Sequence, residues 1–148
     1  MFACEMNLTP APAINGVLET ALYVEDLPRA TKFYREIMGF RLMKGDDVRF
    51  QAFDDGAGRV LLLFKRGGTL TPAEAPGLTI PPHDGSGPQH VGFAISAESY
   101  APWKARLLAL GVAIESEGDW PRGGKSLYFR DGDGHLLELI TPGIWEVY

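Results

Sequence analysis

One pattern of apolar and polar positions occurs twice along the chain. In its first occurrence, residues 17–24 alternate as a strand does, and apolar residues from Ala30 to Ile37 then recur at helical spacing. Asp26 is placed to cap the start of this helix and Gly39 to end it. Three short strands are expected next, at residues 41–44, 49–53 and 59–65. The first half of the chain therefore predicts the order strand, helix, strand, strand, strand.

The second occurrence repeats this order. A strand is expected at residues 90–95 and a helix at 100–110, with Gly111 as its stop. Three strands follow, at residues 112–115, 125–130 and 135–140. The amino-acid types repeat as well, because residues 53–64 align with residues 129–140 without a gap. Two copies of a module that cannot close its own sheet predict a paired arrangement with a cleft between them.

The chain is expected to form a single domain, over residues 17–143. Its 148 residues, 45% of them hydrophobic, are enough for one core. The expected parts are a loose lead-in at 1–16, module 1 at 17–66, a connector rich in proline and glycine at 67–88, module 2 at 89–143 and a tail at 144–148.

Charge and cysteine content narrow the function classes. The 14 basic and 19 acidic residues give a net charge of −5, and no stretch gathers Lys and Arg into a stripe, so no nucleic-acid partner is expected. Apolar runs are too short for a bilayer and no signal-peptide pattern is present, so no membrane association is expected. Because Cys4 is the only cysteine, no intrachain disulfide can form, and a cytoplasmic location is expected.

Glu138 is a charged residue in the middle of an apolar strand. Burying a carboxylate without a partner is costly, so something must compensate for it. The aligned residue of module 1 is Leu62, which means that the fold itself does not require a carboxylate there. A functional role is one explanation, and a structural salt bridge to Arg122 or Arg130 is the other.

Glu19 and His90 occupy matching positions at the heads of the first strands of the two modules. By strand alternation both face away from the apolar side, and the next residue on the same face is small, Ala21 in one case and Gly92 in the other. The small residues leave space where a ligand could approach the sheet. The alternatives are that Glu19 is a solvated residue at a strand start and that a backbone carbonyl satisfies His90.

Other polar and aromatic side chains carry weaker signals. His83 lies in the connector and His135 in a hairpin turn, where solvated histidines are common, so neither is expected to be a ligand. The segment 120–125 could supply an aromatic wall, Trp120, and a cation, Arg122, for an anionic substrate. The alternative is a surface turn with Trp120 packed underneath. The candidates for lining a substrate pocket are Phe64, Trp120, Arg122 and Tyr128.

Several segments together carry a resemblance to a known family. They are residues 22–27, 33–34, 38–40, 89–94 and 129–139, the last of which reads Phe-Arg-Asp-Gly-Asp-Gly-His-Leu-Leu-Glu-Leu. The sequence resembles the glyoxalase, bleomycin-resistance and extradiol-dioxygenase superfamily, also called vicinal oxygen chelate. The resemblance implies an α+β fold in which two paired βαβββ modules form a curved, half-open mixed sheet around a cleft. Dimers are common in that superfamily, so a homodimer is expected.

The resemblance also implies a metal site. In the family, ligands stand at the head of the first strand and in the last strand of each module, which here correspond to Glu19, Leu62, His90 and Glu138. Leu62 cannot ligate, so the implied set is Glu19, His90 and Glu138, similar in number to the dioxygenase and fosfomycin-resistance branches. This sequence departs from those branches at Glu19, where they usually carry histidine. Two carboxylates and one imidazole suit Mn, Fe(II), Ni, Co or Zn.

Two functions follow from these implications. The first is a metal-dependent enzyme, a lyase, isomerase or dioxygenase, that chelates a small oxygenated substrate, with Glu138 as the residue that would leave the metal to move a proton. The alternative is a metal-free protein, resembling the bleomycin-resistance branch, that sequesters a drug or metabolite in the same cleft.

Overall fold

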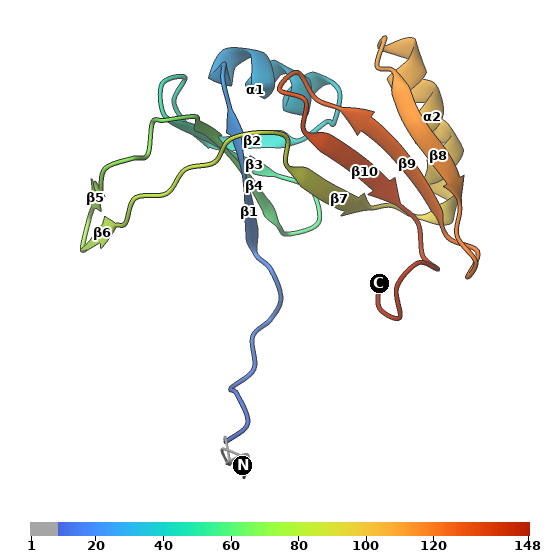
Figure 1. Ribbon diagram of the computed structural model, residues 1–148, viewed down its shortest axis with the longest axis horizontal. Coiled ribbons are helices and arrows are strands. Elements are labelled where there is room, and N and C mark those ends of the chain that lie inside the picture. Colours follow the sequence, from blue (N-terminus) through green and yellow to red (C-terminus); the bar gives the residue numbers. More distant parts are fainter. Residues whose placement is uncertain (1–8) are drawn as a thin grey trace, which may run out of the picture.

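A computed structural model describes residues 9–148 as two four-stranded sheets, each with one helix (Figure 1). Module 1 contains β1 (Glu19–Val24), α1 (Leu27–Glu36), β2 (Arg41–Gly45), β3 (Phe50–Asp54) and β4 (Val60–Lys65). Module 2 contains β7 (His90–Ala94), a 3-10 turn (Ala97–Ser99), α2 (Tyr100–Ala109), β8 (Ile114–Asp119), β9 (Lys125–Arg130) and β10 (Leu136–Ile140). Cys4 and the first half of the expected lead-in lie outside the described residues.

The two sheets have the same topology. Their strand orders are β1-β4-β3-β2 and β7-β10-β9-β8, and in each the first strand runs parallel to its neighbour while the other pairs are antiparallel. The predicted fold class, two βαβββ modules with mixed sheets that do not close into a barrel, is therefore confirmed. Within the described part of the chain, neither helix is long and apolar enough to cross a membrane.

Helix α1 begins and ends where its sequence predicts. The side chain of Asp26 accepts a hydrogen bond from the backbone N–H of Arg29 at 3.0 Å and caps the first turn. Gly39 has a φ of +75°, a left-handed conformation that glycine adopts without strain, just beyond the last turn. The helix buries Leu27, Ala30, Thr31 and Tyr34 against the sheet.

Two elements differ from the sequence expectation. The strand expected at 112–115 is β8, which runs instead from Ile114 to Asp119; it lies at the edge of its sheet, so its residues are mostly exposed and polar and show no alternation. The connector, expected to be a loop, contains a small hairpin of β5 (Ala73–Ala75) and β6 (Leu78–Ile80) that projects from the body in Figure 1. Strands of three residues are too short to produce a readable period.

Buried apolar residues from both modules form one cluster. In β4, Leu61 and Leu63 are at most 2% exposed, whereas Leu62 and Phe64 on the opposite face are only half-buried. The sheets therefore place one face in a common core with the helices and leave the other face open. The open faces carry the side chains that the sequence singled out.

The hairpin turn of module 2 connects the two modules, and His135 is at its centre. The expectation that His135 is solvated is wrong, because this side chain is fully buried. Its Nδ1 accepts from the backbone N–H of Gln89 at 2.9 Å, and its Nε2 donates to the carbonyl oxygen of Tyr23 at 2.7 Å. Beside it, the hydroxyl of Tyr34 donates to the buried carboxylate of Asp131 at 2.7 Å. The turn residues thus bond to β1 and α1 of module 1, a role that position in the sequence does not reveal.

Replacing His135 with alanine is expected to lower the free energy of unfolding by about 2–4 kcal/mol, because a cavity forms and two partly buried backbone groups lose their partner. Urea unfolding measures this change. Arg59, the aligned and exposed residue in the hairpin of module 1, is the matched control, and Arg59→Ala should cost less than about 0.5 kcal/mol. Equal losses in the two variants would contradict the bridging role of His135.

Candidate metal and substrate site

The open face of module 2 brings His90 and Glu138 together. The two residues come from the neighbouring strands β7 and β10, and Nε2 of His90 lies 3.3 Å from Oε1 of Glu138. Glu138 is 6% exposed, whereas the side chain of His90 is half exposed. The other carboxylate oxygen of Glu138 accepts from the hydroxyl of Ser126 at 2.5 Å, and the indole N–H of Trp120 donates to that hydroxyl at 2.8 Å. The carboxylate is thus fixed on one side and directed at His90 on the other.

The ring nitrogens of His90 have different partners. Nδ1 lies 2.8 Å from the carbonyl oxygen of Leu136, which can only accept, so Nδ1 carries a proton. In the neutral ring, Nε2 then presents a lone pair to the carboxylate of Glu138 at 3.3 Å. Two acceptors at this distance repel each other unless a positive charge joins them, either a proton on Nε2 or a metal ion that both ligate. A backbone carbonyl that holds Nδ1–H is also a common way to orient a metal-binding histidine.

The salt-bridge explanation of Glu138 does not hold. Arg130 pairs with Glu115 at 2.6 Å, and Arg122 lies 3.8 Å from Glu146 at the surface. Neither arginine forms a salt bridge with Glu138, whose carboxyl group instead lies against His90, Ser126 and Tyr128. Partial burial and the carboxylate of Glu138 together raise the pKa of Tyr128.

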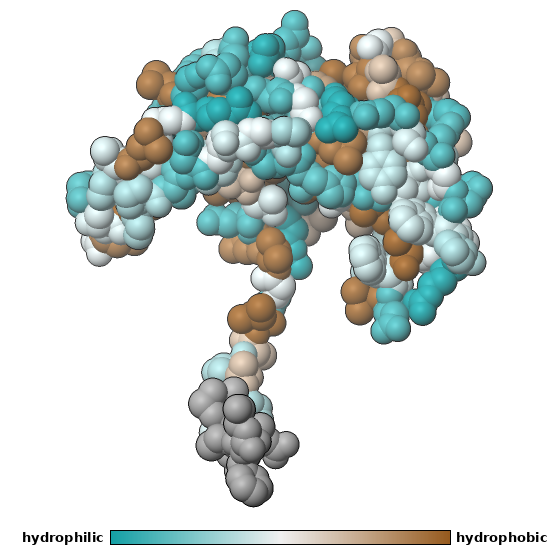
Figure 2. Space-filling view, in the orientation of Figure 1, coloured by the Kyte–Doolittle hydropathy of each residue, from teal (hydrophilic) through white to brown (hydrophobic). Residues whose placement is uncertain are grey.

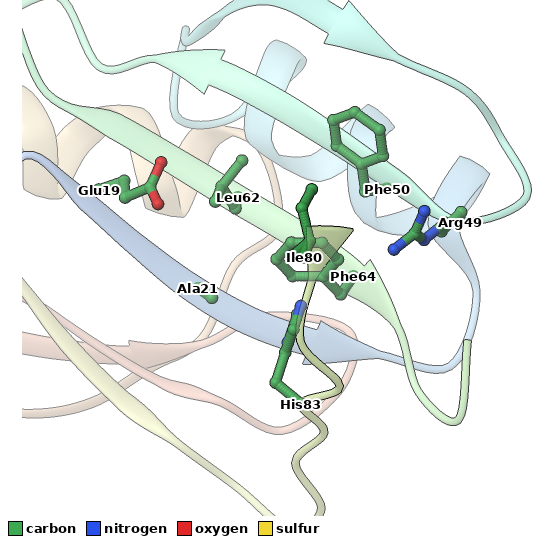
Figure 3. Close-up of a pocket in the computed structure, with 8 residues that line it drawn as sticks. All are labelled: Glu19, Ala21, Arg49, Phe50, Leu62, Phe64, Ile80 and His83. Atoms are coloured by element: carbon green, nitrogen blue, oxygen red, sulfur yellow. The ribbon is translucent and has the colours of Figure 1, made fainter. Parts of the chain in front are cut away.

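The open face of module 1 forms a cavity of about 480 Å³ (Figure 3). Glu19 lies at one end of it and Arg49 at the other, with Leu62, Phe64 and Ile80 between them. The further lining residues are Ala21, Phe50 and His83. His83 is half-buried, contrary to the expectation of a solvated side chain: its Nδ1 is 2.7 Å from the hydroxyl of Tyr23, and its ring contacts the ring of Phe64 edge-on at 4.5 Å.

The two small residues that were expected to leave room for a ligand, Ala21 and Gly92, differ in the space beside them. Ala21 lines the cavity of module 1, so space is present beside it. At Gly92 the side chain of Ile140 takes much of the space, since a Cβ added there would lie 2.6 Å from Cδ1 of Ile140. Ligand space on module 2 lies instead beside Trp120, Ser126 and Tyr128, where a shallow cavity of about 300 Å³ is present.

Comparison with known proteins identifies the family. The sequence profile described as Glyoxalase/Bleomycin resistance protein/Dioxygenase superfamily matches residues 16–139. The chain belongs to this superfamily. The match spans both modules, so the repeat and the open faces described above are those of a vicinal-oxygen-chelate protein.

Three matches, two of them to the same kind of protein, show what this superfamily member is similar to. The fosfomycin resistance protein FosX of Listeria monocytogenes is 31% identical over 134 residues, which are 85% of this chain and 89% of that protein. The structure of lactoylglutathione lyase from Agrobacterium tumefaciens aligns with a TM-score of 0.81 and 30% identity over 91% of this chain and 99% of that one. A FosX variant from Listeria monocytogenes, in complex with Mn(II) and (1S,2S)-dihydroxypropylphosphonic acid, aligns with a TM-score of 0.62 and 26% identity, over 86% of this chain and 90% of that one.

The vicinal-oxygen-chelate fold distributes the predicted site residues over two places in one chain. His90, Glu138, Tyr128 and Trp120 lie on module 2, whereas Glu19 and Phe64 lie in the cavity of module 1. Within residues 9–148 no three His, Cys, Asp or Glu side chains of a single chain gather to hold a metal. The three-ligand set therefore stays a prediction. Arg122 lies in the turn after Trp120 and lines neither cavity.

Sequence reasoning missed Ser126 and Arg49. Ser126 could have been found, because it is a buried polar residue two positions before Tyr128 and therefore on the same face as Glu138. Arg49 gives no such signal, since it immediately precedes β3 and its direction depends on the turn before that strand.

Proposed function

We propose that this protein is a metal-dependent enzyme of the vicinal-oxygen-chelate superfamily, acting on a small oxygenated molecule in the cytoplasm. The observation that carries the proposal is the approach of His90 Nε2 to Glu138 Oε1 at 3.3 Å, which places an imidazole nitrogen and a carboxylate oxygen where one divalent ion could join them. One imidazole nitrogen and a fixed carboxylate fit Mn, Fe(II), Ni, Co or Zn. The Mn(II) in the complex of the relative FosX supports this assignment.

Glu19 is the proposed third ligand, and a second copy of the chain is proposed to supply it. In one chain Glu19 lies in the cavity of module 1, apart from His90 and Glu138. The two modules have the same topology, so module 1 of one copy can face module 2 of another across a two-fold axis, with each dimer holding two equivalent sites.

Exposed apolar side chains support a dimer. Ile14, Val17 and Leu18 are between 60% and 88% exposed on the arm that leads into β1, and brown hydrophobic atoms mark this arm in Figure 2. Apolar surface on a projecting segment favours contact with another chain.

A bound divalent ion would supply two things, a point of chelation for adjacent substrate oxygens and stabilisation of the negative charge that forms in the reaction. The chain's own residues then have defined tasks. Ser126, whose hydroxyl accepts from the indole N–H of Trp120, holds one oxygen of Glu138 and leaves the other available to take or return a proton at the substrate. Phe64 and Tyr128 are proposed to line the substrate space. The proposal covers lyase, isomerase and dioxygenase chemistry, since all of these use one chelating centre on this fold.

The second candidate is a metal-free binding protein that sequesters a drug or metabolite. The apolar cavity of about 480 Å³ on module 1 favours it, because its volume suits a drug-sized molecule. The relative FosX, whose name refers to fosfomycin resistance, is compatible with either candidate.

Titration of the full chain with Mn(II), Zn(II) and Ni(II) tests the enzyme proposal. We expect about one ion per chain, bound with submicromolar affinity and removed by a chelator, together with a higher melting temperature in the metal-bound form. Affinities weaker than micromolar for every ion would contradict the enzyme and leave the binding protein as the better explanation.

A further inference from the structure

The cavity of module 1 has a charged group at each of its two ends. Glu19 pairs with Val60 at the start of β4, whereas the backbone carbonyl of Arg49 accepts from Lys65 at its end. These positions are five residues apart along β4, which corresponds to roughly 16 Å of strand. Glu19 is the proposed metal ligand, so the Arg49 end is the one remote from the metal (Figure 3).

The middle of the cavity is apolar. The rings of Phe50 and Phe64 lie 6.0 Å apart with an angle of 31° between their planes, and Ile80 of the hairpin lies beside them. Leu62 occupies the position that holds a carboxylate in module 2, so no charge interrupts this surface. A flat or branched apolar group of a ligand would be removed from water here at a gain of about 25 cal/mol per Å².

Arg49 is partly buried, and its guanidinium has no hydrogen-bond or ion-pair partner among residues 9–148. The acidic side chains next to it form their hydrogen bonds with other groups, and backbone hydrogen bonds, followed by the charge of Arg49, lower the pKa of Asp46. Asp46 accepts from the backbone N–H groups of Val48 and Arg49, and Asp47 accepts from the side chain of Gln51 at 2.9 Å. A partly desolvated arginine without a carboxylate partner favours binding of an anion.

The connector holds one wall of the cavity in place. The hydroxyl of Tyr23 contacts Nδ1 of His83 at 2.7 Å, and the backbone N–H of His83 donates to the carbonyl of Thr69 at 3.0 Å. The hydroxyl of Thr69 donates in turn to the carbonyl of His83. These bonds fix His83 against Tyr23 of β1 and against Thr69, so the wall of the cavity that His83 forms is in place before a ligand arrives.

We infer that this cavity binds the body of an elongated apolar anion, with the chelating oxygens at the Glu19 end, the apolar part against Phe50, Phe64 and Ile80, and the negative group at Arg49. The inference deepens the proposed function and rests on it for the place of the chelating oxygens. The three-carbon phosphonate in the FosX complex could reach only one end of such a cavity. The substrate is therefore larger, an aromatic or branched aliphatic acid with two vicinal oxygens distant from the acid group.

Calorimetric titration of the full chain, without added metal, with 2-naphthoate and with its neutral analogue 2-naphthamide tests the inference. We expect naphthoate to bind about tenfold or more tightly than the amide, and Arg49→Met to remove this difference while leaving amide binding unchanged. Phe64→Leu should weaken both ligands. Arg35→Met, which removes the same charge from an exposed position on α1, should change neither affinity.

Equal affinities of the wild-type protein for the acid and the amide, or an unchanged preference in Arg49→Met, would overturn the inference. Because no metal is added, this result is independent of the metal titration. If the protein binds naphthoate through Arg49 but binds no metal, the anion site is supported and the enzyme proposal is refuted. If it binds metal but does not prefer naphthoate, the enzyme proposal is supported and the anion site is refuted.

Discussion

Glu138→Gln is expected to weaken Mn(II) binding by at least about 100-fold, a larger loss than that caused by removing a residue that only orients a ligand. The amide keeps the size of the side chain and can still bond to Ser126, but it removes the negative charge beside His90. His90→Ala should weaken binding to a similar degree, because it removes the nitrogen donor. Calorimetric titration with Mn(II) measures both losses.

The control for this prediction is Glu115→Gln. Glu115 lies on β8 of the same sheet and pairs with Arg130 at 2.6 Å, so its substitution changes the net charge equally without touching the proposed site. Metal affinity should stay within about twofold of the wild-type value. Melting temperatures of all variants show whether they are folded. If folded Glu138→Gln and His90→Ala proteins bound Mn(II) as the wild type does, the site would lie elsewhere.

Mixing two inactive variants is expected to restore metal binding if the site spans two copies. Glu19→Ala and Glu138→Ala each lose one proposed ligand from every site. In a mixed dimer, one of the two sites carries both substitutions and the other carries neither, so random reassociation should regenerate about a quarter of the wild-type sites. The two variants are unfolded together in urea, refolded, and assayed for tightly bound Mn(II).

The control mixture combines His90→Ala with Glu138→Ala. Both substitutions lie on module 2, so each site of the mixed dimer keeps one defect and no metal binding should return. Restored metal binding in this control would mean that His90 and Glu138 of one site do not come from the same subunit. Absence of restoration in the Glu19 and Glu138 mixture, with dimers present by light scattering, would place all ligands within one chain.

The sequence predicted the parts of the fold that depend on local periodicity. The repeated strand and helix pattern, the cap at Asp26 and the stop at Gly39 were confirmed, because alternation and capping act over a few neighbouring residues. The unusual position of Glu138 was also visible, since a carboxylate in an apolar strand contradicts the pattern around it.

What the sequence could not predict depends on how the modules pack. The burial of His135 arises from contacts with Tyr23 and Gln89, which are 112 and 46 residues away in the chain. The separation of Glu19 from His90 within one chain has the same origin, because strand alternation gives the face on which a residue lies but not which other sheet that face meets. The absence of an ion pair at Arg49 likewise depends on the hydrogen bonds that Asp46 and Asp47 form with other groups of the same turn.

Module 1 has Leu62 at the position where module 2 has Glu138, and this difference gives the two modules unequal roles. Under the proposed assembly, module 2 contributes two of the three metal ligands, while most of module 1's open face is free to vary in shape and charge. Substitutions at Phe50, Phe64 or Arg49 can then alter which molecule is accepted without disturbing the reactive centre. Two modules of the same fold would then divide the work of one enzyme, with the metal held mainly on module 2 and the choice of substrate made mainly on module 1.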